Sequence, residues 1–168
     1  ADSEDPAIQV PKVTETVQAV YSGYDENNLI YVQGNHDTAS SSLTPTGYYE
    51  FENFVVYSIN EDDFKTRQSG RADYNAVVQT LADNVAVKLE NLVKTGDNRP
   101  VFVITHLPLH HSSRSSYGEN LYSKYLFDVL NNYGTELDII FLFGHNHSST
   151  YDDYIGGAVN YIAKGEEI

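Results

Sequence analysis

The chain has 168 residues, 40% of them hydrophobic, which suits one domain of ordinary size with a real core. Its formal net charge of −14 argues against nucleic-acid backbones and anionic membranes as partners, because both attract Lys and Arg. The sequence contains no cysteine, which excludes disulfides and thiolate metal sites, and no apolar run is long enough for a membrane span. We therefore expect a single domain over residues 1–168.

The first third of the chain predicts a loop, a helix and a short strand. Residues 1–11 are acidic and bracketed by prolines, which indicates a loop or a frayed start. From residue 12 onward, apolar residues recur at helical spacing until Ser22-Gly23. Residues 29–32 are an apolar run, which predicts a short buried strand ahead of Gly34.

The middle of the chain predicts a hairpin followed by the longest helix. Residues 38–47 are rich in Ser, Thr and Pro, which is typical of a loop. Residues 48–59 are dense in aromatic and β-branched side chains and predict a strand or a hairpin. Residues 71–94 carry the longest helical pattern of the chain, and Gly96 is a candidate C-cap residue.

The last part continues the alternation of strands and helices. Residues 101–105 and 137–143 predict buried strands, and residues 121–130 between them predict a helix. Residues 151–163 predict two strands that turn near Gly156-Gly157. This alternation indicates an α/β fold.

Each of three predicted strands ends in a group of polar side chains. The first is followed by Gly34-Asn35-His36-Asp37, the second ends at Thr105-His106, and the third is followed by Gly144-His145-Asn146-His147. Carboxyl ends of strands in open α/β sheets meet at a crevice where ligands bind. All six histidines of the chain lie at or just after these strand ends: His36, His106, His110, His111, His145 and His147. A lone histidine is more often an ordinary polar residue, but this clustering favours a functional site.

The residue types at these strand ends suit a transition metal and a proton donor. Imidazoles and an amide oxygen favour zinc, manganese or iron over calcium. We therefore expect four residues to converge on one crevice: Asn35, His106, His145 and His147. His36 beside Asp37 is typical of a general acid or base with an orienting carboxylate.

In this order the motifs resemble the calcineurin-like metallophosphoesterase family. The signature of that family runs Asp-x-His, Gly-Asp, Gly-Asn-His-Asp/Glu, His and Gly-His-x-His, and the last three blocks span residues 34–147 here. The resemblance implies a two-sheet sandwich with helices outside, in α/β/β/α layers. It also implies hydrolysis of phosphate esters by two metal ions (manganese, iron or zinc) that share a bridging hydroxide, which attacks phosphorus in line.

The resemblance also implies a role for each matching residue. The family's metal ligands fall on four positions, namely Asn35, His106 and His145 for the second metal and His147 for the first. His36 would protonate the leaving alkoxide, and Asp37 would orient the His36 side chain.

The first two blocks of the family signature do not occur before Gly34. In the family they supply an Asp and a His to the first metal and an Asp that bridges both metals. Gly96-Asp97 follows the long predicted helix, so we expect it to be a helix-ending turn and not the missing Gly-Asp block. The expectation is a C-terminal part of a catalytic domain, from a parent enzyme, that alone binds one metal or none and is impaired.

The polar loop after His106 is a candidate substrate site. It contains His110, His111 and Arg114, and a guanidinium is well suited to binding a phosphate group. A solvated loop with incidental histidines explains the same residues, and the sequence leaves both interpretations open. The expected partner is a small phosphorylated substrate.

Two other functions and several properties stay open. The chain could be a non-catalytic binding module on the same fold, or it could hold one structural zinc ion through His106, His145 and His147, whose chelation would melt the fold. The substrate class and the metals are undecided. The acidic, cysteine-free composition is compatible with a bacterial extracytoplasmic protein but assigns no compartment. A domain that lacks edge strands would expose sheet edges that favour self-association.

Overall fold

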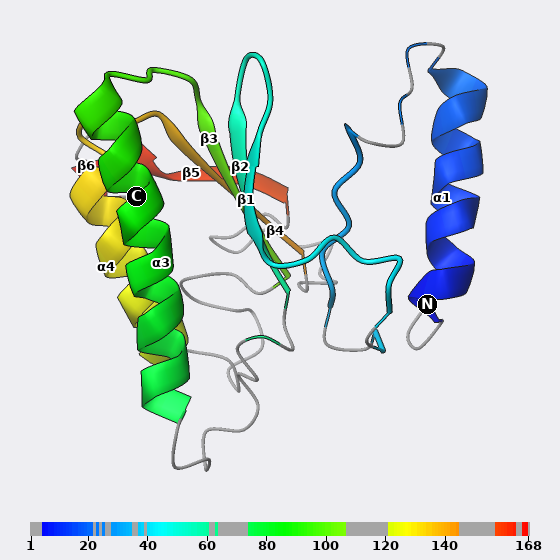
Figure 1. Ribbon diagram of the computed structural model, residues 1–168, viewed down its shortest axis with the longest axis horizontal. Coiled ribbons are helices and arrows are strands. Elements are labelled where there is room, and N and C mark those ends of the chain that lie inside the picture. The colour runs from blue at the N-terminus through cyan, green and yellow to red at the C-terminus, as the bar shows by residue number, and fades with distance from the viewer. Residues whose placement is uncertain are drawn as a thin grey trace.

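The computed structural model contains helices and strands in the order expected of a mixed α/β fold (Figure 1). Its helices include α1 (Pro6–Val20), α3 (Tyr74–Thr95) and α4 (Leu121–Tyr133). Its strands include β1 (Gly47–Glu50), β2 (Val55–Ile59), β3 (Val101–Thr105), β4 (Ile139–Phe143), β5 (Gly157–Ala163) and β6 (Glu166–Glu167). The residues that the structure describes are 5–21, 23, 25, 28–34, 37–38, 40–60, 63, 74–106, 121–144, 157–163 and 166–167.

The strands pair in one sheet in the order β1-β2-β3-β4-β5-β6. The β2–β3 and β3–β4 pairs are parallel, and the other pairs are antiparallel. In the registers of the parallel pairs, Thr105 lies beside Ile59 and Leu142 lies beside Ile104. The carboxyl ends of β2, β3 and β4 therefore meet at one edge of the sheet, as the α/β prediction requires.

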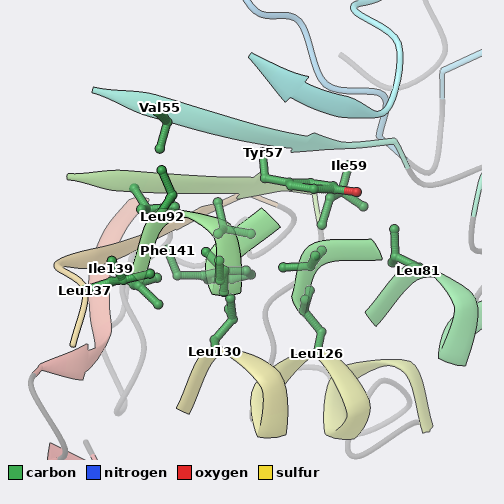
Figure 2. Packing of buried hydrophobic residues seen from close by; sticks show 14 of the residues in the cluster. Val55, Tyr57, Ile59, Leu81, Leu92, Leu126, Leu130, Leu137, Ile139 and Phe141 are labelled. Carbon is green, nitrogen blue, oxygen red and sulfur yellow. The ribbon is translucent and has the colours of Figure 1, made fainter. Parts of the chain in front are cut away.

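Helices α3 and α4 pack against each other and cover one face of this sheet (Figure 1). Buried apolar residues of α3 recur every three or four positions, which places them on one stripe of the helix. Figure 2 shows Leu126 and Leu130 of α4 directed at the layer that contains Phe141 of β4. Full burial of each large apolar side chain contributes about 1.5–3 kcal/mol. The core that positions the strands is therefore a helix-on-sheet layer.

The end of α3 confirms the predicted C-cap at Gly96. Gly96 adopts a φ of 68°, in the left-handed region that favours glycine. Its N–H donates to the Val93 carbonyl at 3.1 Å, and the Asp97 N–H donates to the Leu92 carbonyl at 3.0 Å. These two bonds form a Schellman motif, which stops the helix before β3.

The predicted start of the first helix was wrong, because α1 begins at Pro6 and not near residue 12. Asp5 caps the helix by accepting the Ala7 N–H at 2.9 Å, and Pro6 occupies the first turn, where proline is tolerated. Pro11 lies inside the helix and has no N–H to donate there. In Figure 1, α1 stands apart from α3 and α4.

The strand predicted at residues 29–32 was also wrong. The structure assigns these residues to no strand. Tyr31 exchanges hydrogen bonds with Thr44 instead: its N–H donates to the Thr44 hydroxyl at 2.9 Å, and its carbonyl accepts the Thr44 N–H at 3.0 Å. The backbone N–H and carbonyl of Tyr31 are thus paired without a sheet ladder.

Most other predicted elements are confirmed. The hairpin over residues 48–59 forms as β1 and β2, and the strand at residues 101–105 has the predicted bounds. The helix predicted for residues 121–130 runs on to Tyr133, and the next strand starts at Ile139. Residues 151–156, including the predicted turn at Gly156, lie outside the described residues.

The structure bears on the fold class but not on the predicted layering. The mixed α/β class is confirmed, whereas the second sheet of the sandwich stays a prediction because the described strands form one sheet. The single-domain assignment likewise stays a prediction. Among the described residues, no helix is long and apolar enough to cross a bilayer.

Candidate active site

Three residues follow parallel strands at the same edge of the sheet: Asn60 after β2, His106 after β3 and Gly144 after β4. The Gly144 N–H donates to the His106 carbonyl at 3.1 Å, one step beyond the β3–β4 ladder. This bond fixes the backbone of the second predicted motif against the first residue of the third.

The imidazole of His106 lies close to two glycine backbones. A Cβ atom placed on Gly34 would lie 3.0 Å from His106 Nδ1, and one placed on Gly144 would lie 3.6 Å from the same nitrogen. The first contact is tighter than ordinary van der Waals packing, so a side chain at position 34 would push against the ring. The glycines of the first and third motifs therefore both lie beside the histidine of the second.

Asp37 closes a turn that begins at Gly34. Its Oδ2 accepts the Gly34 N–H at 2.7 Å, and its own N–H donates to the Gly34 carbonyl at 3.2 Å. The Gln33 side chain also donates to the Asp37 carbonyl at 3.3 Å. The two residues between Gly34 and Asp37 in sequence are Asn35 and His36, which lie outside the described residues. The orientation of His36 by Asp37 therefore stays a prediction.

Two residues, Asn60 and Thr44, hold the residues that lead to Gly34 (residues 29–34, the Gly34 segment) and were not predicted from the sequence. The buried Asn60 accepts the Gln33 N–H on its Oδ1 at 2.8 Å, and its Nδ2 donates to the Thr44 carbonyl at 2.8 Å. Thr44 in turn pairs with Tyr31. The available signal was the position of Asn60 directly after an apolar strand, the same signal that marked His106.

A family model for calcineurin-like phosphoesterases matches residues 9–149, most of the chain and all three motifs. The chain belongs to the calcineurin-like phosphoesterase family. Members of this family hydrolyse phosphoesters with a metal centre. No curated protein and no solved structure matches the chain significantly.

The described part of the site offers donor types that fit the metals of this phosphoesterase family. Asp37 Oδ2 and His106 Nδ1 lie within 3.2 Å of one point beside Gly34, where a Cβ would stand. Imidazole nitrogen and carboxylate oxygen are accepted by manganese, iron and zinc. Within the described ranges, no group of three or more His, Asp or Glu residues could hold a metal ion. The other predicted site residues fall outside those ranges: Asn35, His36, His110, His111, Arg114, His145 and His147.

The Gly96-Asp97 pair is confirmed as a helix-ending turn, so it does not stand in for the Gly-Asp block of the phosphoesterase signature. Asp97 accepts Arg99 Nε at 3.0 Å and Arg99 Nη2 at 2.6 Å, and these bonds lower the pKa of the Asp97 carboxyl. Arg99 also donates to Glu50 at 3.0 Å and to the Phe51 carbonyl at 2.6 Å. This ion cluster ties the hairpin to the amino end of β3, at the edge opposite His106.

Proposed function

We propose that this chain carries part of a dinuclear metal centre that hydrolyses a small phosphorylated substrate. One observation carries the proposal: Gly34, His106 and Gly144, from three separate motifs, meet at the carboxyl edge of a parallel strand pair in a member of this family. That edge is where open α/β sheets bind their ligands.

In this proposal each motif supplies residues with distinct tasks. Asn35, His106 and His145 would hold one metal ion, and His147 would contribute to the other. A pair of transition-metal ions, when bound, supplies a hydroxide nucleophile and neutralises charge that develops on the phosphoryl group. His36 would give a proton to the leaving alkoxide oxygen.

The Gly34–Asp37 turn supports the task given to His36. Asp37 uses Oδ2 for the Gly34 N–H, and its second carboxylate oxygen can accept a hydrogen bond from an imidazole. Arg114, with His110 and His111, would bind the phosphate oxygens of the substrate.

A second candidate function is a non-catalytic binding module with a degenerate metal site. It is favoured by the absence of Asp-x-His and Gly-Asp ahead of Gly34, since the family takes the remaining ligands of one metal from those blocks. For the same reason we propose that the 168-residue chain alone is impaired as an enzyme.

Metal stoichiometry tests the proposal. The purified chain is exposed to Mn²⁺ and Zn²⁺, desalted, and analysed by elemental mass spectrometry together with a phosphomonoester turnover assay. We expect at most one bound ion, lost in His106→Ala, because His106 is the predicted ligand that the core fixes. Two ions with measurable turnover would contradict the proposed impairment and would mean that ligands come from elsewhere, such as a second copy.

A surface control is needed because a chain of net charge −14 attracts cations without a specific site. Asp83→Asn removes one carboxylate from the exposed side of α3 and should leave the stoichiometry unchanged. Equal metal retention by the unaltered chain and by His106→Ala would refute the metal site.

A further inference from the structure

The side chain of Asn60 connects three segments of the candidate site. Asn60 is only 8% exposed, although it is polar. Its Oδ1 accepts from the Gln33 N–H and its Nδ2 donates to the Thr44 carbonyl, each at 2.8 Å. Its backbone N–H donates to the Thr46 hydroxyl, also at 2.8 Å. Both ends of the amide and the backbone N–H are therefore used inside the protein.

These bonds take the place of a sheet ladder for the Gly34 segment. Tyr31 is bonded to Thr44, Thr44 to Asn60, and Asn60 to Gln33, so the hydrogen bonds form a closed path. Gln33, the last residue on this path, directly precedes Gly34, and the Gly34 backbone lies against the ring of His106. Because Asn60 also follows β2, the path anchors this segment to the carboxyl edge of the sheet.

We propose that Asn60 is a positioning residue, which holds the Gly34–Asp37 turn at the distance from His106 that the metal site needs. Its importance for catalysis rests on the proposed function, whereas its effect on the position of Gly34 does not. In this proposal Asn60 acts through the backbone of Gln33 and needs no contact with substrate or metal.

The chemistry of the amide explains why asparagine is needed at this position. Aspartate keeps an acceptor for the Gln33 N–H, but it places a second oxygen where Nδ2 donates to the Thr44 carbonyl. Alanine removes both bonds and leaves the Gln33 N–H without this acceptor, which is costly for a buried group. Both substitutions should therefore release Gln33 and Gly34 from the sheet edge.

NMR of the full 168-residue chain tests the positional part of the proposal without any need for activity. One Gly34 Hα points toward the position that a Cβ would occupy, and that position lies 3.1 Å from His106 Cε1. A nuclear Overhauser effect between Gly34 and the ring is therefore expected. In Asn60→Ala we expect this signal to disappear and the Gln33 amide to exchange its hydrogen at least about ten-fold faster. Asn60→Asp should change both in the same direction, and it preserves the side-chain volume in case the alanine variant does not fold.

Two control variants separate positioning from general loss of stability. Asn53→Ala removes an exposed asparagine from the turn of the same hairpin and should change neither signal. Ile59→Val removes one buried methylene next to Asn60 and lowers stability without breaking these hydrogen bonds. A Gly34–His106 signal and a Gln33 exchange rate that both persist in Asn60→Ala, within about two-fold, would overturn the proposal.

Titration with Mn²⁺ alone then tests the connection to the metal site. If the unaltered chain binds Mn²⁺, we expect Asn60→Ala to weaken the affinity several-fold, with Ile59→Val close to the unaltered chain. Loss of the Gly34–His106 signal with unchanged Mn²⁺ affinity would overturn the positioning role. If the unaltered chain binds no Mn²⁺, as the proposed impairment allows, the NMR result alone decides whether Asn60 sets the position of Gly34.

Discussion

The two sides of the candidate site are held in place in different ways. His106 follows β3, which is paired in register with β2 on one side and β4 on the other and packs against the core under α3 and α4. The Gly34 segment belongs to no strand. Its hydrogen bonds to other parts of the chain include those to Thr44, to the Asn60 side chain and, through the Tyr31 hydroxyl, to α1. One side of the site is therefore part of a cooperative sheet, and the other depends on a few polar contacts.

This difference indicates where the site can change without loss of the fold. Segments with few buried apolar contacts open at lower free energy than core strands. The position of His106 should therefore be lost only with global unfolding, whereas the Gly34–Asp37 turn should separate from His106 in a smaller, local opening.

The largest expected effect is on the side of the site that the core holds. Leu89 of α3 is 1% exposed, and Leu89→Ala should lower the free energy of unfolding by about 2–5 kcal/mol, because it leaves a cavity between helix and sheet. Urea denaturation measures this change. Val87 on the same helix is 61% exposed, so Val87→Ala serves as the control and should stay within about 0.5 kcal/mol. Similar losses of unfolding free energy for both variants would show that α3 does not pack against the sheet through the face that contains Leu89.

Alanine substitutions at Gly34 and Gly144 should affect the His106 ring unequally. In Gly34→Ala the new Cβ would lie 3.0 Å from His106 Nδ1 and 3.2 Å from Asp37 Oδ2, so the ring or the turn must move. We expect a loss of about 1–3 kcal/mol and a changed chemical shift of the His106 ring protons.

Gly144→Ala is the matched control, since its Cβ would lie at an ordinary contact distance of 3.6 Å. It should be neutral or stabilising by up to about 1 kcal/mol, through reduced entropy of the unfolded chain. Equal effects of the two substitutions, in urea denaturation and in the His106 spectrum, would contradict the contact between Gly34 and the ring.

The same contrast explains what the sequence could and could not predict. The long apolar stripe of α3 and the run at residues 101–105 are local signals, and the elements they predict form where expected. The run at residues 29–32 is too short to distinguish a paired strand from a segment outside the sheet. Its described backbone hydrogen bonds run to Thr44, which is distant in sequence. The helix start was missed because Pro6 was treated as part of a loop, although proline is favoured in the first turn.

For the candidate site, the sequence indicated which motifs to compare but not how they are held together. Histidines at strand ends marked His106, and the glycines beside it came with their motifs. Asn60 carried only the positional part of that signal, directly after an apolar strand, and a single asparagine there is common at turns. The role of Asn60 becomes visible only in the structure, where the Gln33 N–H donates to the Asn60 side chain.

The smallest expected effect lies at the opposite edge of the sheet and should leave the site unchanged. The pKa of Asp97 is lowered by its hydrogen bonds from Arg99, so this carboxylate stabilises the fold above its unfolded-state pKa of about 3.9. The stabilisation is lost as pH falls through the lower pKa of the folded state. Asp97→Asn should therefore reduce the melting temperature by a few degrees at neutral pH, and the difference from the unaltered chain should shrink as the pH falls through the lowered pKa of Asp97.

The exposed Lys94–Glu90 pair on α3 provides the control for this pH dependence. Its side chains are 66% and 50% exposed, so Glu90→Gln should change the melting temperature little at any pH. A melting-temperature difference for Asp97→Asn that stays the same from neutral to acid pH would mean that charge on Asp97 does not stabilise the fold. The same variant also tests whether the two edges of the sheet are independent. Because the cluster of Glu50, Asp97 and Arg99 lies at the amino end of β3, the Gly34–His106 nuclear Overhauser effect should persist in Asp97→Asn. Its loss there would show that the two sides of the site are not independent of the far edge of the sheet.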